Sequence, residues 1–389
     1  NKRGKKLRHC LQTEMDDQQH EMAMVTDDDG TPATSSHESS GVPLPPPVTA
    51  PTEGTNKLHL FGDEHLAREH AETPQAERDQ ATRDLYGIDD YVIDETDNFL
   101  EESLLLLDEA IQDVEEKEAY ELGLFVNPDY ITSKNFHIMF LRAERFDIPK
   151  TAIRIVKYWG RKVQLFGTDH AFKPLSILDF PSQDEVALRC GGLALLNTRD
   201  QVGRAVFFCY RKYWDHRPES RESMVRLMWL VIHTAVEDDE LVQRNGVVGL
   251  MANDMSSQAG TSETYASQSQ AASYFDPALH HWLWNDAGIL PFRVAGIHHF
   301  TPQSDILSFI YNRSGLFFMG RTARLLYRRY NGTKDENMAR LEEYGLTSDM
   351  VPTELGGGMI FDKSLWIRSR VERDMLLLTM EQQAKIAGG

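Results

Sequence analysis

The chain has 389 residues, 41% of them hydrophobic, and 60 Asp and Glu against 41 Lys and Arg give a formal net charge of −19. Three cysteines are too few for a disulfide framework, which favours a reducing, cytoplasmic compartment over an extracellular one. The longest uncharged apolar run, residues 227–236, has about half of the roughly twenty residues that a membrane span needs, and we expect no secretory signal after the basic residues 1–8.

The negative charge is concentrated in the N-terminal third. Residues 1–88 have a net charge of −7 and residues 89–121 of −13, whereas residues 122–389 have +1. The acidic pI of the whole chain therefore does not argue against contact between the remaining two thirds and an anionic surface.

Residues 1–88 are predicted to be a disordered leader, because residues 1–60 are rich in Ser, Thr, Asp and Pro and residues 63–84 are polar enough for a transient helix at most. Within it, Pro43, Pro45, Pro46 and Pro47 form a short polyproline II candidate. This segment is either a solvated tail or a ligand for an SH3- or WW-type partner.

Residues 89–122 are predicted to form an acidic amphipathic helix. Its apolar residues recur at helical spacing and are Leu100, Leu104, Leu107, Ile111 and Val114. Two interpretations remain open. The helix packs on its neighbours and exposes its acidic face to solvent, or its part at residues 94–121 folds over a basic surface and masks it.

A helical unit is predicted over residues 123–180. Thr132 or Ser133 can cap a first helix, Asp147 can cap a second one with Pro149 in its first turn, and Gly167 can end it.

From residue 181 to 360 the pattern becomes α/β. Strands are predicted at residues 193–196, 206–210, 246–251 and 294–300, and helices at residues 222–236, 274–285, 305–319, 321–330 and 334–344. Strands that alternate with helices predict a mixed sheet covered by helices. Residues 361–389 are predicted to contain a C-terminal helix over residues 366–385.

The sequence offers no recognisable catalytic signature. It contains no P-loop, HExxH, CxxC or GxSxG motif. The adjacent pairs His280-His281 and His298-His299 do not chelate one metal by themselves, because neighbouring residues of a helix or strand point to different sides. Without a nucleophile–base pair, we expect no enzymatic activity and no metal.

Residues 304–329 combine an apolar half with an arginine cluster, and no acidic residue lies between Asp305 and Asp335. Such a combination suits a surface that meets anionic headgroups. A core helix beside a solvated basic helix is the simpler interpretation. The near-zero charge of this part argues against nucleic acid. The cluster consists of Arg313, Arg321, Arg324, Arg328 and Arg329.

Five short segments occur in a defined order: residues 140–147 (FLRAERFD), 200–206 (DQVGRAV), 247–254 (VVGLMAND), 290–293 (LPFR) and 351–357 (VPTELGG). Together they resemble the signatures of the CRAL-TRIO family, of the phosphatidylinositol and α-tocopherol transfer type. The resemblance implies an α/β/α sandwich that follows a helical N-terminal unit, with a mixed sheet as the floor of a hydrophobic pocket and a gate helix over residues 304–319.

The resemblance also implies the pocket residues. The strand residues predicted to face the pocket are Phe208, Tyr210, Val248, Leu250, Ile297 and His299, and the gate residues are Ile306, Phe309, Ile310 and Phe317. Strand residues of the opposite parity are predicted to face the packing helices; they are Phe207, Cys209, Val247, Gly249 and His298.

The function that the resemblance implies is lipid binding and exchange. The protein would be a monomer that holds one lipid or other small hydrophobic ligand in a gated pocket and docks transiently on anionic membranes through the arginine cluster. The alternative is a lipid-sensing signalling scaffold whose leader recruits protein partners.

Overall fold

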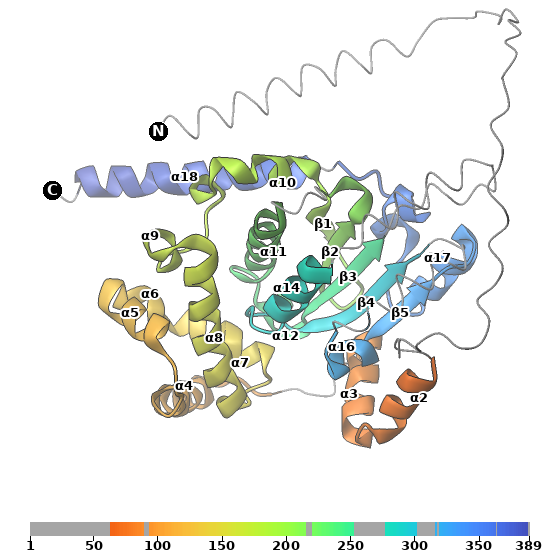
Figure 1. Ribbon diagram of the computed structural model, residues 1–389, viewed down its shortest axis with the longest axis horizontal. Coiled ribbons are helices and arrows are strands. Elements are labelled where there is room, and N and C mark those ends of the chain that lie inside the picture. Colours follow the sequence, from red (N-terminus) through yellow and green to blue (C-terminus); the bar gives the residue numbers. More distant parts are fainter. Residues whose placement is uncertain are drawn as a thin grey trace, which may run out of the picture. The chain divides into compact units, whose positions relative to one another are not determined.

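The computed structural model describes residues 63–88, 93–214, 220–252, 277–301, 316, 319–362 and 364–387 (Figure 1). The chain divides into two units, residues 1–60 and 61–389, and the description below concerns the second unit. The polyproline segment with Pro43 and Pro47 and most of the predicted gate helix, including Ile306, Phe309, Ile310, Arg313 and Phe317, lie outside the described residues.

The helical N-terminal part is organised around one long helix, α8 (Ile148–Phe166). Asp147 caps it as predicted, because its side chain accepts a hydrogen bond from the backbone N–H of Lys150 at 3.2 Å. Gly167 ends it with a φ of +70°. The helices around it are α4 (Asp97–Gln112), α5 (Glu118–Val126), α6 (Pro128–Ile131), α7 (Lys134–Ala143) and α9 (Thr168–Ala171).

The prediction of one helix over residues 89–122 is wrong, because α4 ends at Gln112 and α5 begins at Glu118. Helix α4 itself follows the first of the two interpretations of the acidic segment. It packs against α7 and α8 and buries Leu107 and Ile111, whereas Asp108 and Glu109 are exposed. The acidic face of α4 is therefore exposed to solvent and does not cover the described arginines of the cluster.

The second part is a five-stranded mixed sheet in the order β1-β2-β3-β4-β5. Strand β1 is antiparallel to β2, and the other neighbours are parallel. The strands are β1 (Leu193–Arg199), β2 (Ala205–Tyr210), β3 (Val247–Ala252), β4 (Val294–Phe300) and β5 (Tyr327–Tyr330). The fold is thus mixed α/β with a helical N-terminal part, as predicted.

The strand order determines which face the connections cover. When parallel strands are neighbours in chain order, the connections between them are crossovers. Right-handed crossovers in such a series all lie on the same face of the sheet. Helix α11 (Arg221–Val236) accordingly contacts β1 and β2, and it packs against α14 (Pro277–Ala287) (Figure 1). The short helix α12 (Glu240–Asn245) leads from α11 into β3.

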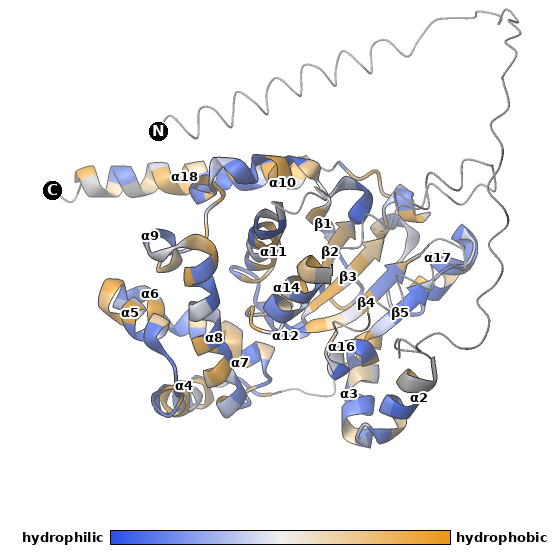
Figure 2. Cartoon of the chain, viewed as in Figure 1, coloured by the Kyte–Doolittle hydropathy of each residue, from blue (hydrophilic) through white to orange (hydrophobic). Residues whose placement is uncertain are grey.

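The opposite face is covered by the chain that follows β5. Helix α17 (Lys334–Glu342) and the turn η7 (Thr353–Leu355) pack there against β2 and β3. Because both faces are covered, β2 and β3 are apolar along their length, whereas α17 is mostly hydrophilic (Figure 2).

Residues 63–88 form two helices, so the predicted leader does not extend through this segment. They are α2 (Asp63–Glu72) and α3 (Gln75–Tyr86). Ala81 and Leu85 of α3 pack against Leu326 and Tyr344. These contacts, between residues about 240 to 260 positions apart, stabilise a helix whose sequence is polar, which explains why the segment alone suggests at most a transient helix.

The predicted helix over residues 321–330 is wrong beyond residue 325. Helix α16 (Arg321–Leu325) is followed by β5. The edge of β4 supplies the hydrogen bonds: the N–H of Ile297 donates to the carbonyl of Leu326 at 3.0 Å, and that of Thr301 to the carbonyl of Tyr330 at 2.9 Å. A tertiary pairing of this kind overrides local helix propensity.

The C-terminal helix α18 (Leu365–Ala387) is anchored at its first half. Arg370 donates to the carbonyl of Leu175 at 2.8 Å, and Asp374 accepts from the N–H of Ile177 at 2.8 Å. None of the helices that the structure describes is long and apolar enough to cross a membrane. The remaining short elements are α10 (Glu185–Cys190), η1 (Ile177–Asp179), η2 (Ser182–Asp184), η3 (Arg211–Tyr213) and η6 (Ser348–Met350).

Candidate functional site: an apolar cavity with a polar end

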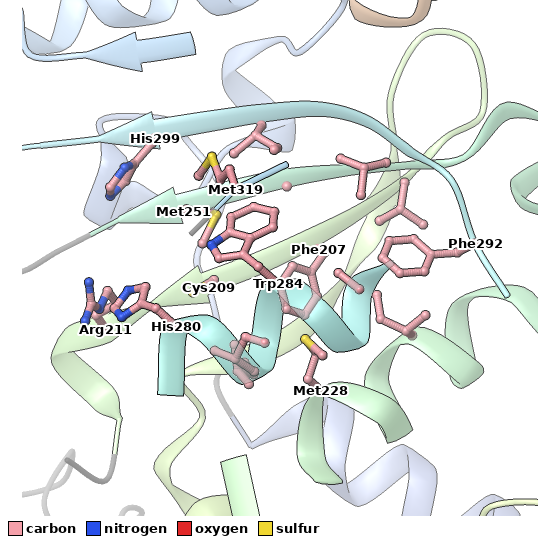
Figure 3. A pocket seen from close by; sticks show the side chains of 18 of the residues that line it. Phe207, Cys209, Arg211, Met228, Met251, His280, Trp284, Phe292, His299 and Met319 are labelled. Carbon is pink, nitrogen blue, oxygen red and sulfur yellow. The ribbon is translucent and has the colours of Figure 1, made fainter. Parts of the chain in front are cut away.

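A cavity lies between the sheet and the helices α11 and α14 (Figure 3). The volume of this cavity is about 90 Å³. Its floor is formed mainly by Phe207, Cys209, Val247, Gly249, Met251 and Ile297. The helices contribute Met228, Ile232, Leu283, Trp284 and Ala287. The lining is therefore almost entirely apolar.

The prediction of which residues of β2 and β3 face the cavity is wrong. Phe208, Tyr210, Val248 and Leu250 belong to the core on the opposite face, under α17. The residues of the other parity, which were predicted to face the packing helices, form the cavity floor. Both parities are apolar in strands buried on two faces, so alternation alone could not determine the phase.

In strand β4 the predicted residues face the cavity. Ile297 and His299 line the cavity, and they pair with Gly249 and Met251 of β3. Residues paired across neighbouring strands lie on the same face. A shift in register between Val247 and Val248 brings the odd-numbered residues of the two strands together.

The polar residues of the lining gather at one end. Arg211 directly follows β2, His299 lies near the end of β4, and His280 is in the first turn of α14 (Figure 3). The carboxyl ends of parallel strands meet at one edge of a sheet, which brings Arg211 and His299 to the same end. Phe292 and Val294 mark the other, apolar end. A ligand with one polar and one apolar end would therefore bind in a single orientation.

His299 is the most informative of these residues. Its Nδ1 is hydrogen-bonded to the hydroxyl of Tyr327 at 2.7 Å. Its Nε2 is buried and has no hydrogen-bond partner among the described residues. Burial, assisted by the charges of Arg211 and Arg329, lowers the pKa of His299 to about 3. The ring is therefore neutral at physiological pH and presents one unsatisfied nitrogen at the cavity.

His298 has a matching environment on the other face of the sheet. Its Nδ1 is hydrogen-bonded to the hydroxyl of Tyr330 at 2.8 Å, and burial and then the charges of Arg204, Arg328 and Arg340 lower its pKa to about 3. It does not line the cavity. Within the described residues, no three His, Cys, Asp or Glu side chains gather as a metal site.

The arginines of the cluster that the structure describes, from Arg321 to Arg329, do not form one open surface. Arg321 pairs with Glu77 at 2.7 Å, and Arg324 Nε donates to Glu69 at 2.7 Å. The acidic residues that cover these arginines thus come from α2 and α3, not from the segment 94–121. Arg328 Nε donates to the hydroxyl of Tyr344 at 3.2 Å. Arg329 is exposed.

Sequence reasoning did not predict Arg211, His280, Trp284 or Met228 as cavity residues. Arg211 had a usable signal, because it is the first charged residue after an apolar strand whose carboxyl end faces the site. His280 and Trp284 are four positions apart and hence share one side of α14. Only the packing of α14 on the sheet shows which side faces inward.

No protein-family model and no curated protein matches the chain. Among solved structures, the chain is similar to a crystal structure of Sfh5, with 8% sequence identity and a TM-score of 0.36. This similarity covers 78% of the present chain and 99% of that chain. The function proposed below rests on the residues and the cavity of this chain.

Proposed function

We propose that the protein is a CRAL-TRIO-type lipid-binding protein that holds one hydrophobic ligand in the cavity and exchanges it with membranes. The observation that carries this proposal is an apolar cavity with one polar end, built between a mixed sheet and the two helices α11 and α14. Lipids have the same division between an apolar body and a polar end.

The energetics favour an occupied cavity. At about 24 cal/mol per Å³, leaving about 90 Å³ empty costs about 2 kcal/mol of stability. Each methylene moved from water into an apolar site contributes about 0.8 kcal/mol, so the part of an apolar ligand that enters the cavity gains free energy by leaving water. Both terms act in the direction of ligand binding.

Exchange requires contact with a membrane surface, and the arginine cluster supports this part of the proposal. Arg321 and Arg329 are exposed, and each arginine near an anionic leaflet contributes about 1 kcal/mol. Binding of Arg321 and Arg324 to headgroups would break their ion pairs within the protein. In this proposal the protein acts from the cytoplasm as a peripheral membrane protein, with a gate that the family resemblance assigns to residues 304–319.

The test uses a substitution in the cavity floor that fills part of the cavity. A Cβ added at Gly249 would lie 3.8 Å from the carbonyl oxygen of Gly296 and 3.9 Å from Met251 Cγ, which are ordinary van der Waals contacts. A Cβ thus fits at this position of the cavity floor. Gly249→Leu adds a larger side chain there, and Gly249→Ala, which adds the Cβ alone, serves as the matched control.

Native mass spectrometry and lipid extraction of the purified protein provide the measurement. We expect a co-purifying lipid at about one equivalent in the unmodified protein and in Gly249→Ala, and its loss in a folded Gly249→Leu. An empty, well-folded protein that also takes up no lipid from vesicles would contradict the proposal and favour the scaffold alternative.

A further inference from the structure

The cavity is smaller than the ligand that the proposed function assigns to it. Its volume of about 90 Å³ is the share of roughly three water molecules in the liquid. A lipid therefore enters only if part of the wall moves. Strands β2, β3 and β4 are inner strands of the sheet, so the floor cannot widen without the loss of backbone hydrogen bonds.

Met319 belongs to a part of the wall that secondary structure does not fix. It lines the cavity and is 4% exposed, but it lies in neither a helix nor a strand. It leads into the short helix α16, none of whose residues is buried. The position of Met319 in the wall therefore depends on contacts from other parts of the chain.

One arginine connects this part of the wall to helix α2. Arg324 Nη1 donates to the backbone carbonyl of Leu316 at 3.2 Å and to that of Met319. On the other side of the guanidinium, Nε donates to one carboxylate oxygen of Glu69 at 2.7 Å, and Nη2 donates to the other oxygen. Because a guanidinium is planar, this two-bond contact with Glu69 orients Nη1 toward the wall.

The contact between Glu69 and Arg324 is only partly shielded from water. The side chain of Arg324 is 12% exposed and that of Glu69 is 21% exposed. Ion pairs that water reaches are weaker than buried ones, and an anion at the surface competes with the carboxylate for the same guanidinium. The anionic headgroups of a membrane are such competitors.

We propose that the Glu69–Arg324 pair is a latch, which holds Met319 in the cavity wall and whose release lets the cavity widen and exchange its ligand. This inference rests on the proposed function and concerns the regulation of that site. A headgroup that binds Arg324 displaces Glu69, so Nη1 is no longer oriented toward the wall. Contact with a membrane thereby shifts the protein toward the open state.

Cys209 reports opening of the cavity. It lines the cavity and is 1% exposed. Burial raises the pKa of its thiol to about 12, and a thiol reacts with N-ethylmaleimide as an accessible thiolate. Peptide mapping of the full chain gives the rate of modification at Cys209 and at Cys190, which is half-buried and does not line the cavity. Native mass spectrometry of each sample gives the lipid content, so rates are compared at equal occupancy.

Three variants separate the latch from a change of charge. Glu69→Gln removes the carboxylate of the latch. Glu77→Gln is the matched control, because Glu77 pairs with Arg321 of the same helix α16 at 2.7 Å, and no hydrogen bond of Arg321 within the described part of the chain reaches the cavity wall. Arg324→Lys keeps the positive charge without the planar fork. Thermal melting establishes that each variant is folded.

We expect the rate of modification at Cys209 to rise at least about fivefold in Glu69→Gln and in Arg324→Lys, because each loses the charge-assisted contact that orients Nη1. The rate at Cys190 should not change, and Glu77→Gln should behave like the unmodified protein at both cysteines. Lipid uptake from phosphatidylserine vesicles should be faster in Glu69→Gln than in Glu77→Gln.

Equal rates at Cys209 in Glu69→Gln and Glu77→Gln, or a parallel rise at Cys190, would overturn the latch and leave lipid binding intact. A faster rate at Cys209 in Glu69→Gln, without lipid in any sample before or after exposure to vesicles, would support the latch and overturn the proposed function.

Discussion

Arg204 and Asp200 form an ion pair inside the fold. One carboxylate oxygen of Asp200 accepts the backbone N–H of Arg204 at 2.8 Å, and the other accepts from the guanidinium. Arg204 is only 2% exposed and also donates to the backbone carbonyls of Asp84 and Leu85 in α3. The D-x-x-G-R segment thus has a structural explanation, since it joins the turn between β1 and β2 to α3.

Removing one member of this pair should be strongly destabilising. Arg204→Met leaves the carboxylate of Asp200 buried without its partner, so we expect the free energy of unfolding to fall by about 3–5 kcal/mol. The double variant Asp200→Asn/Arg204→Met should lose less than the sum of the two single variants. Denaturant titration measures these values.

A partly exposed ion pair provides the control for this prediction. Arg199 and Asp239 lie 2.5 Å apart, with side chains 40% and 33% exposed. Arg199→Gln should therefore cost at most about 1 kcal/mol. Equal losses for Arg199→Gln and Arg204→Met would show that burial does not set the strength of the Arg204 pair.

Stability should fall below pH 6.5 because of the buried histidines. The pKa values of His298 and His299 are lowered from 6.5 to about 3 in the folded protein. Between these values the unfolded chain binds more protons than the folded one, so acid favours unfolding. Each histidine should remove about 1.6 kcal/mol of stability between pH 6.5 and 5, because the slope rises from about half of 1.4 kcal/mol per pH unit at pH 6.5 to nearly the full value at pH 5.

The measurement is the free energy of unfolding at several pH values in that range, compared between the unmodified protein and His298→Phe. The variant should show the smaller slope, whatever its stability at pH 7. His137 and His233, whose pKa values burial also lowers, remain in both proteins and preserve part of the slope. Parallel pH profiles would contradict the assignment of a neutral, buried His298.

The ion pairs between α2, α3 and α16 should limit membrane binding. Glu69→Gln and Glu77→Gln remove the carboxylates that pair with Arg324 and Arg321, so these carboxylates no longer neutralise the arginine charges. We expect the double variant to bind phosphatidylserine-containing vesicles more tightly, by about fivefold for each arginine released, in a co-sedimentation assay.

Glu72→Gln is the matched control, because Glu72 is exposed on the same helix α2 and changes the net charge by the same amount as either single substitution. Purely zwitterionic vesicles should show no gain for any variant. An equal gain for Glu72→Gln would mean that overall charge, and not release of Arg321 and Arg324, controls binding.

Elements with strong local signals could be predicted from the sequence. Strand β4 has the predicted bounds, and α8 begins after Asp147 and ends before Gly167 as its caps indicate. Helix α3 and strand β5 could not be predicted, because α3 depends on contacts with Leu326 and Tyr344 and β5 on pairing with β4. Their local sequences carry little information about these distant partners.

The site was predictable only in part, for a related reason. His299 and Ile297 lie on the cavity side as predicted, whereas Phe208 and Leu250 lie on the other side. An apolar strand specifies that it is buried but not which of its faces meets a cavity. That choice depends on the crossover helices α11 and α14, whose position follows from the order of the strands.

The two margins of the sheet have consequences for aggregation. Strand β5 is an outer strand of the described sheet, has four residues, and carries Arg328 and Arg329. Short length and repeated positive charge discourage intermolecular strand pairing. At the opposite margin, α18 packs against β1. Both margins are thus protected from adding a strand of another molecule, a safeguard for a protein whose two central strands are among its most apolar segments.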